Sequence, residues 1–188
     1  MDQLRTYLNA IEPIPEAAWQ EIAPVLSLGK LAKGDFFSEK GEQSIYLGFL
    51  LSGSMRAFSR NPEGKDYNKS FFVAPSLFGP LSALVTGQPN QIMIEAMEPC
   101  TLVRIPYLEL VAQYERHHAF ERLARKYAEY LFVQKEIREI DLVTLDAAER
   151  YKKFQAQFPG LENRIPQYHI ASYLGVTATQ LSRIRGKK

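Results

Sequence analysis

The segment IPQYHIASYLGVTATQLSRIRGKK, residues Ile165–Lys188, carries the strongest pattern in the sequence. Pro166 suits the first turn of a helix, and Gly175 suits the left-handed position at which such a helix ends. Thr177 then begins a second helix, because Gln180 follows it at the spacing of a capping box. The segment therefore predicts two short helices joined by a tight turn, which is the pattern of a helix-turn-helix.

The second predicted helix has an outward side that is polar and cationic. Leu181 and Ile184 share the inward face, and the side chains between them point away from it. A helix of this kind can enter the major groove of DNA, with its first residues near base edges and its basic residues near phosphates. Arg183 is the candidate for a paired contact to guanine. The residues that we expect to contact DNA are Gln167, Thr177, Thr179, Gln180, Ser182, Arg183 and Arg185.

Two further features of the segment are predicted at the same time. Lys187 and Lys188 extend the cationic side beyond the second helix, and His169 in the first helix is expected to be exposed to solvent. The alternative for the whole segment is a helical pair that only closes a core. The local basic excess favours the DNA-reading interpretation.

The charge of the chain is divided unevenly along its length. Residues 150–188 contain eight Lys or Arg and one acid, a net charge of +7, whereas residues 1–149 contain fifteen Lys or Arg and twenty acids, a net charge of −5. A basic end on an acidic body favours a polyanionic partner for that end alone. A basic surface that is merely solvated is the alternative.

Short alternating runs dominate from about Leu28 to Pro106, and PEGK at residues 62–65 is a turn signal between two of them. Many short strands in about eighty residues are typical of an antiparallel barrel or jelly roll. With helices on both sides, the predicted fold class is therefore α+β. The clearest strand candidates are IYLGFLLSGSMRAFS (45–59), KSFFVAP (69–75), IMIEAM (92–97) and TLVRIP (101–106).

From Tyr107 to about Thr144 the pattern is helical. Six residues spaced by three and four predict one seam with a single polar member, Gln134, which is a candidate for setting the register. The seam favours a twin helix from a second copy. Phe132 and Val133 lie off this seam and are candidates for a contact with the barrel. The alternative is a helix whose seam is buried in its own subunit. The seam consists of Phe120, Leu123, Tyr127, Tyr130, Gln134 and Ile137.

Several function classes lack the residues that they require. No run of 18 apolar residues is present, so we expect no membrane span. The single Cys100 favours a reducing compartment, and the first twenty residues lack the layout of a secretion signal. An enzyme of the cupin type would need several His inside the barrel, and none falls there. We therefore expect no enzyme, no catalytic residues, no metal and no cofactor.

A barrel, a long helix and a terminal helix-turn-helix, in this order, resemble the Crp–Fnr family of transcription regulators. YLGFLLSGSMRAF at residues 46–58 resembles the family's strand–Gly–strand hairpin, and IPQYHIASYLGVTATQLSRIR at 165–185 resembles its DNA-reading motif. The resemblance implies a cytoplasmic homodimer on double-stranded DNA, with a small-molecule effector and RNA polymerase as candidate partners. It also implies three domains: a cyclic-nucleotide-binding-like β jelly-roll barrel with N-terminal helices (1–111), a dimerisation helix (112–144) and a helix-turn-helix domain (145–188).

LFGPLSALVTGQPNQIMIEA, residues 77–96, resembles the family's phosphate-binding cassette. In members that bind cyclic AMP the cassette holds a Gly-Glu pair and later an Arg beside Ser or Thr. Here Pro80 stands at the Glu position, and Asn90 and Gln91 stand at the Arg and Ser positions. No Lys or Arg lies between Lys69 and Arg104, so a buried phosphate would lack its countercharge. The sequence therefore predicts that the chain does not bind cyclic AMP in the usual manner.

Two interpretations of the barrel stay open: a less charged ligand in the same cavity, or a filled barrel that serves as a scaffold. The residues expected to line a ligand cavity are Phe78, Gly79, Leu81, Ser82, Asn90 and Gln91. The main alternative function is a ligand-sensing or protein-interaction module on the same fold that does not read DNA.

Overall fold

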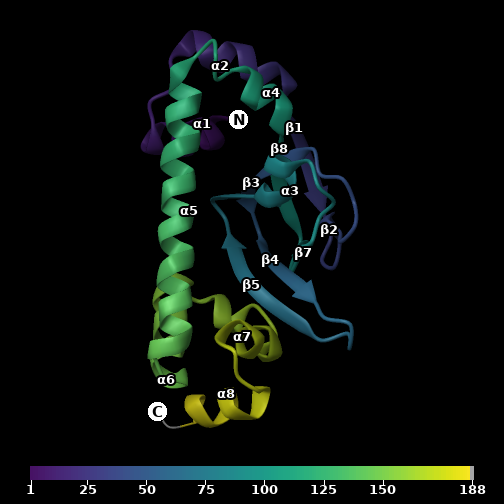
Figure 1. Cartoon of the computed structure of the whole chain (residues 1–188), viewed down its shortest axis with the longest axis vertical. Coiled ribbons are helices and arrows are strands. Elements are labelled where there is room, and N and C mark those ends of the chain that lie inside the picture. Colours follow the sequence, from purple (N-terminus) through teal and green to yellow (C-terminus); the bar gives the residue numbers. More distant parts are fainter. Residues whose placement is uncertain (187–188) are drawn as a thin grey trace. The chain divides into compact units, whose positions relative to one another are not determined.

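The structure is a computed structural model, and it describes residues 1–186 (Figure 1). Lys187 and Lys188 lie outside the described residues. The helices are α1 (Asp2–Ile11), α2 (Glu16–Ile22), α3 (Leu81–Thr86), α4 (Tyr107–Ala112), α5 (His118–Thr144), α6 (Ala147–Gln157), α7 (Gln167–Leu174) and α8 (Ala178–Arg185), with short 3-10 turns at Ala23–Val25 and Leu161–Asn163. The strands are β1 (Ser27–Leu31), β2 (Phe36–Ser38), β3 (Tyr46–Ser52), β4 (Ser54–Arg60), β5 (Asp66–Val73), β6 (Ser76–Phe78), β7 (Met93–Ala96) and β8 (Cys100–Pro106).

The strands form two four-stranded sheets, one in the order β1-β8-β3-β6 and the other in the order β2-β7-β4-β5. In the first sheet β8 pairs antiparallel with both β1 and β3, and Phe49 lies opposite Val103. This arrangement is an antiparallel jelly-roll sandwich with flanking helices, as the alternating runs predicted, and the fold class is α+β.

Glycines make the two turns that join β3, β4 and β5. Gly53 separates β3 from β4 at a φ of +97°, and a Cβ there would lie 2.6 Å from the Sγ of Cys100. Gly64 has a φ of +78° in the predicted PEGK turn, where the Asn61 N–H donates to the Lys65 carbonyl at 3.0 Å. Only glycine adopts these conformations without steric cost, so the predicted positions of both turns are confirmed.

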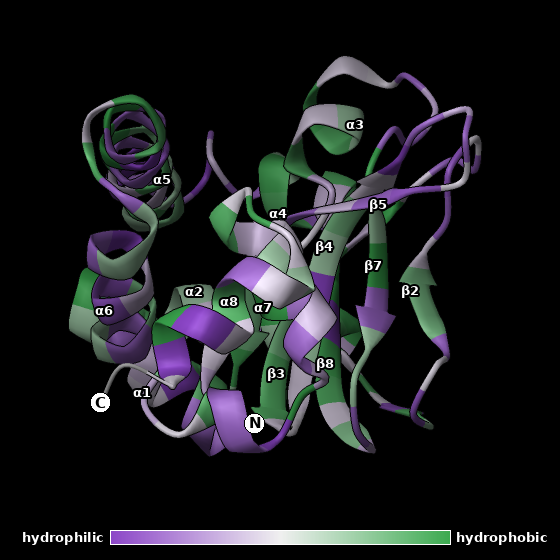
Figure 2. Cartoon of the chain, turned by 90° about the horizontal axis from the view of Figure 1, so that it is seen from below, coloured by the Kyte–Doolittle hydropathy of each residue, from purple (hydrophilic) through white to green (hydrophobic). Residues whose placement is uncertain are grey.

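The chain divides into two compact units. Unit 1 consists of Met1–Ala57 and Phe71–Tyr130, and unit 2 consists of Phe58–Ser70 and Leu131–Lys188. In unit 1, apolar side chains of α1, α2 and the first turns of α5 pack in one core with Phe49, Val103 and Ile105 of the first sheet. Strand β3 is correspondingly green in Figure 2, whereas β5 is mostly purple.

Unit 2 has its own core, formed by α6, the 3-10 turn after it, α7 and α8. Phe154 is fully buried, and its ring lies 5.8 Å from that of Tyr173 and 5.4 Å from that of Phe158. Asp146 and Glu149 begin α6 with a complete capping box, which fixes the start of the first helix of this core. The buried apolar side chains from α6 to α8 are Tyr151, Phe154, Phe158, Leu161, Ile165, Ile170, Ala171, Tyr173, Leu174 and Leu181.

The long helix α5 begins at His118, because a turn at residues 113–117 separates it from α4. The predicted dimer seam on this helix is wrong in its first half. Phe120 and Leu123 are buried in the core of unit 1, and the Tyr127 hydroxyl donates to the Leu77 carbonyl at 2.9 Å. The spacing gave the period of the seam correctly, but these side chains pack within their own chain.

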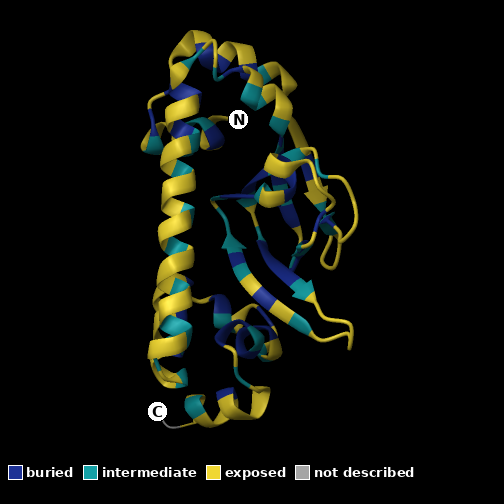
Figure 3. Cartoon of the chain, viewed as in Figure 1, coloured by how far each residue is buried: buried dark blue, intermediate teal, exposed yellow. Residues whose placement is uncertain are grey.

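The exposed apolar stripe of α5 follows a different register. Tyr130, Val133, Ile137 and Ile140 are exposed and are spaced by three, four and three residues, so they share one face of the helix. Phe132 and Val133, the candidates for a contact with the barrel, are 66% and 47% exposed. Figure 3 shows α5 as mostly exposed along its length.

Candidate functional site

The last two helices, which we call the terminal helix pair (Gln167–Arg185), begin and end where the sequence predicted. Pro166 precedes α7, and Gly175 ends it at a φ of 70°, in the left-handed region. The Val176 N–H then donates to the Ala171 carbonyl at 3.0 Å, which satisfies one of the last carbonyls of α7. The turn between the two helices is therefore fixed by hydrogen bonds of the backbone.

The start of α8 is fixed by the predicted capping box. The Thr177 Oγ1 accepts from the Gln180 N–H at 3.2 Å, and the Thr177 N–H donates to the Gln180 Oε1 at 2.9 Å. Both side chains hold the start of the helix, and both remain exposed. Leu181 is fully buried beneath them, so the opposite side of α8 is directed outward.

The structure brings most of the predicted DNA-contacting residues together on the exposed side of α8. Thr179, Ser182, Arg183 and Arg185 are all exposed, and they stand beside the capping residues. Gln167 lies apart from them on α7: it is half-buried, and its Nε2 donates to the Glu162 carbonyl at 2.9 Å.

Arg183 and Arg185 have different surroundings. Arg185 lies against the phenol of Tyr151, which also hydrogen-bonds to Glu162. Burial and the Glu162 hydrogen bond raise the pKa of Tyr151, while Arg185 opposes this shift. Arg185 is therefore in contact with its own unit, and Arg183 is the cation of α8 best placed to reach a separate partner.

Arg150 connects the ends of two helices in unit 2. Its Nε donates to the Leu174 carbonyl at the end of α7 at 3.0 Å, and its Nη1 donates to the Leu145 carbonyl just after α5. Lys153 pairs with Asp141 at 2.6 Å. These two cations of the basic segment are thus engaged within the unit, and its outward positive charge comes from fewer residues than the sequence count suggests.

His169 was expected to be exposed, and this is wrong, because it is buried at 8% exposure. Its Nδ1 lies 3.3 Å from the Asn68 Nδ2, and its carbonyl accepts from the same nitrogen at 3.1 Å. Asn68 belongs to β5, about a hundred residues earlier in the chain. Asn68 was not among the predicted site residues, and its burial between the exposed Tyr67 and Lys69 is visible only in the structure.

The barrel interior in unit 1 is filled by aromatic side chains. The ring of Phe78 is 97% buried and lies 4.7 Å from the ring of Phe37 and 5.5 Å from that of Phe72. A Cβ at Gly48 would lie 2.2 Å from the Phe78 Cζ, so the ring occupies the space above this glycine. Leu50, Met55, Ile94 and Leu102 complete the same buried cluster.

The predicted ligand residues differ in how far they are buried. Phe78 and Asn90 are buried, Leu81 is half-buried, and Ser82 and Gln91 are exposed. Gly79 has a φ of +155° and packs against Leu47.

Asn90, at the position of the family's arginine, holds the loop before β3. Its Nδ2 donates to the Ser44 Oγ at 2.7 Å, and its carbonyl accepts from the Gly41 N–H at 2.8 Å. Its side chain therefore supports a loop and supplies no positive charge.

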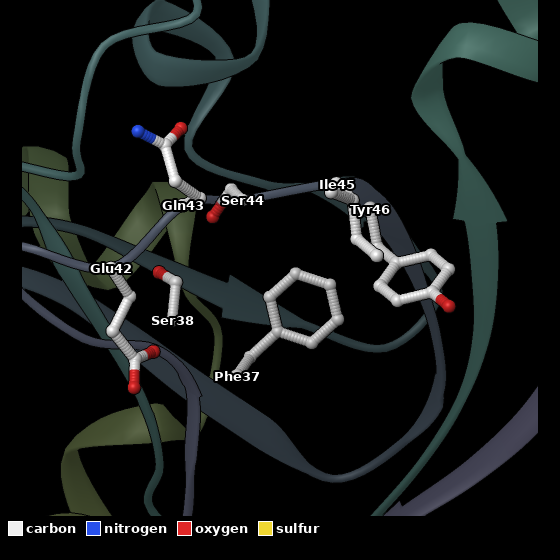
Figure 4. A pocket seen from close by; sticks show the side chains of 7 residues that line it. All are labelled: Phe37, Ser38, Glu42, Gln43, Ser44, Ile45 and Tyr46. Carbon is white, nitrogen blue, oxygen red and sulfur yellow. The ribbon is translucent and has the colours of Figure 1, made fainter.

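A pocket of about 190 Å³ lies beside this loop (Figure 4). Its lining comes from β2, the following loop and the start of β3, and it includes none of the predicted ligand residues. None of the lining residues is Lys or Arg, so the pocket offers no cation to a phosphate. The lining residues are Phe37, Ser38, Glu42, Gln43, Ser44, Ile45 and Tyr46.

Within residues 1–186, no group of His, Cys, Asp and Glu is arranged to hold a metal ion. None of the helices in this described part is long and apolar enough to cross a membrane.

Comparisons with known proteins agree with this architecture. The family model of the cyclic nucleotide-binding domain matches residues 28–117. No curated protein matches the sequence. FixK2 from Bradyrhizobium japonicum has a TM-score of 0.74 at 17% identity, with 86% of this chain and 83% of that chain covered.

Two further solved structures are similar. CLP from Xanthomonas campestris, described as a c-di-GMP responsive global regulator of virulence gene expression, has a TM-score of 0.71 at 12% identity, covering 92% of this chain and 91% of its own. The sensor domain of the transcriptional regulator DNR from Pseudomonas aeruginosa has a TM-score of 0.60 at 21% identity, covering 77% and 94%. Residues 28–117 thus match the cyclic nucleotide-binding domain, and the chain is similar in fold to FixK2, CLP and the sensor domain of DNR.

Proposed function

We propose that this chain is a dimeric, DNA-binding transcription regulator of the Crp–Fnr type whose barrel does not take cyclic AMP in the usual manner. The observation that carries the proposal is the exposed side of α8. It presents Thr179, Ser182 and Arg183 together, while Leu181 anchors the helix from the opposite side. Polar and cationic side chains on a short, well-capped helix are suited to reading base edges in a major groove.

The named neighbours support the same function. The descriptions of CLP and DNR place both in gene regulation. The basic excess of residues 150–188 agrees with a polyanionic partner at this end of the chain. We therefore assign Arg183 to a base edge, and Thr179 and Ser182 to bases or adjacent phosphates.

The exposed stripe of α5 supports the dimer. Tyr130, Val133, Ile137 and Ile140 form an apolar face with coiled-coil spacing that the described residues of the chain leave exposed. A second copy would cover this face with the identical face of its own helix, in a two-fold arrangement. Two α8 helices related by such an axis would read half-sites about one turn of duplex apart.

The filled barrel supports the second half of the proposal. Phe78 occupies the interior beside the cassette, and Asn90 stands where a cation would be needed. An anionic phosphate buried there would be unpaired, and this costs several kcal/mol. We propose that the barrel acts as a scaffold for the hairpin and the long helix.

The decisive experiment is selection of bound sequences from a random DNA pool by the full-length chain. We expect a two-fold symmetric site whose binding weakens steeply with salt. The matched variants are Arg183→Ala and Lys152→Ala, because Lys152 is an exposed cation of α6. Failure to enrich any sequence, or binding that does not respond to salt, would favour the interaction module over the regulator.

A further inference from the structure

The far end of the β4–β5 hairpin, residues 58–70, belongs to unit 2 together with the terminal helix pair. This end is internally braced. The Arg60 Nε pairs with Asp66 at 2.6 Å, and the Asn61 Oδ1 accepts from the Lys65 N–H at 2.8 Å. These bonds fix the conformation of the two-stranded hairpin, so the hairpin can position an element that packs against it.

Asn68 connects this hairpin to α7. Its side chain is fully buried, and its Nδ2 donates to the His169 carbonyl at 3.1 Å and contacts the His169 Nδ1 at 3.3 Å. Because an amide nitrogen is a donor, the Nδ1 of His169 is the acceptor. The Asn68 N–H also donates to the Ser172 Oγ at 2.9 Å, so the backbone and the side chain of Asn68 both bind the same helix.

Two more side chains complete this polar cluster, which we call the Asn68 cluster (Asn68, Arg138, His169, Ser172 and Tyr173). The Ser172 hydroxyl donates to the Asp66 carbonyl at 2.8 Å. The Arg138 Nη2 on α5 donates to the Tyr173 carbonyl at 2.8 Å and to the Asn68 carbonyl at 3.4 Å, and its guanidinium lies 3.9 Å from the centre of the Tyr173 ring. The hairpin, the long helix and α7 are therefore joined around the buried Asn68, with Arg138 and Ser172 half-buried beside it.

A buried polar cluster of this kind selects one arrangement over others. A shift of α7 along the hairpin would leave the Asn68 amide without its acceptor, and an unpaired buried donor is costly. Apolar contacts alone tolerate such shifts, because they have no preferred direction. The cluster thus specifies the register of α7 against the hairpin.

We propose that Asn68 is a positioning residue for DNA reading. By fixing α7 it fixes α8, because the two helices share the buried Leu174 and Leu181 core and the hydrogen-bonded turn at Gly175. This inference rests on the proposed function.

The test uses Asn68→Asp in the full-length chain, which keeps the shape and replaces the Nδ2 donor by an acceptor facing the His169 carbonyl. The control is Asn61→Asp, which makes the same change of charge in the same hairpin but keeps the Oδ1 acceptor of the turn. Both are measured against a DNA library in which the selected half-sites are separated by different numbers of base pairs.

For Asn68→Asp we expect the preferred spacing to broaden, the half-site sequence to stay the same, and affinity for the wild-type operator to fall roughly tenfold. The control should keep the wild-type profile. An unchanged spacing profile in a folded Asn68→Asp protein overturns the proposal. An equal loss of affinity at every spacing, in proportion to the unfolded fraction of the variant, also overturns it. Such a loss would show that the substitution acts only by lowering the stability of the protein.

If Asn68→Asp does not fold, Ser172→Ala gives the same test in a milder form, because it removes only the hydroxyl that joins Asn68 to Asp66. Amide hydrogen exchange of α7 supplies a readout without DNA. Faster exchange in the variants than in the control supports the hairpin contact, and unchanged exchange contradicts it. Failure of the wild-type chain to select any DNA would instead defeat the proposed function, and the two failures are therefore distinguishable.

Discussion

The barrel interior and the exposed side of α8 are the two places where a regulator of this fold would meet its ligands, and they have opposite characters. The interior holds packed aromatic rings around Phe78 beside a cassette without a cation. The surface of α8 holds exposed polar side chains and Arg183 on a helix with a complete capping box. Under the proposed function, the exposed side of α8 would contact DNA, whereas the cassette offers no Lys or Arg as a countercharge for an anionic nucleotide.

The largest expected effect is a loss of stability from a substitution in the barrel interior. Phe78→Ala should lower the free energy of unfolding by about 3–5 kcal/mol, because it removes a buried ring and leaves a cavity. Urea unfolding of the full-length chain measures the loss. The control is Phe132→Ala on the exposed side of α5, which should stay within about 0.5 kcal/mol. A loss no larger than that of the control would show that the interior is not tightly packed.

On the DNA side, Arg183→Ala should weaken binding to the selected operator by about 1–3 kcal/mol and relax specificity at one base pair. Fluorescence anisotropy at several salt concentrations measures both. Lys152→Ala should have a smaller effect that is the same for all sequences, with the salt slope lowered by about one at most. If both variants lost affinity equally for all sequences, Arg183 would not contact a base edge.

The next prediction concerns the dissociation constant of the proposed dimer and the exposed stripe of α5. Ile137→Glu places a charge in the middle of the exposed stripe, and we expect the dimer dissociation constant to rise about tenfold or more. Analytical ultracentrifugation over a range of concentrations gives this constant. Phe132→Glu is the control, because Phe132 lies off the stripe and is more exposed than Ile137 (66% against 43%). A dimer more sensitive to the change at Phe132 than to that at Ile137 would place the contact on another face.

The smallest expected effect is that of cyclic AMP on the stability of the chain, which we expect to be zero. A ligand at a thousand times its dissociation constant stabilises the folded state by about 4 kcal/mol. Millimolar cyclic AMP should therefore leave the melting temperature unchanged if the cassette has lost its anion site. Calorimetric titration checks the same point directly, and micromolar affinity would refute the prediction.

The parts of the fold that could be predicted from the sequence are those set by local chemistry. The β3–β4 turn at Gly53, the capping box of Thr177 with Gln180, and the stop at Gly175 each depend on residues close together in the chain. Such local signals do not depend on the tertiary packing around them, and all three features appear at the expected positions.

The parts that could not be predicted depend on which partner a face meets. The three- and four-residue spacing of Phe120, Leu123 and Tyr127 marks a buried face, but it does not say whether the cover is a second copy or the same chain. His169 and Asn68 are polar residues buried by a contact across about a hundred residues. No local pattern identifies such a pair before the fold is known.

The pairing of Gly48 with Phe78 constrains how related barrels could gain a ligand cavity through successive mutations. Enlarging residue 48 first would drive a methyl group to within 2.2 Å of an aromatic carbon, so that route passes through an overpacked intermediate. Replacing Phe78 by a smaller residue first creates free volume, so that a larger residue at position 48 no longer clashes. The two substitutions are therefore order-dependent, and a lineage that opens this barrel to a small molecule should show the change at 78 before any change at 48.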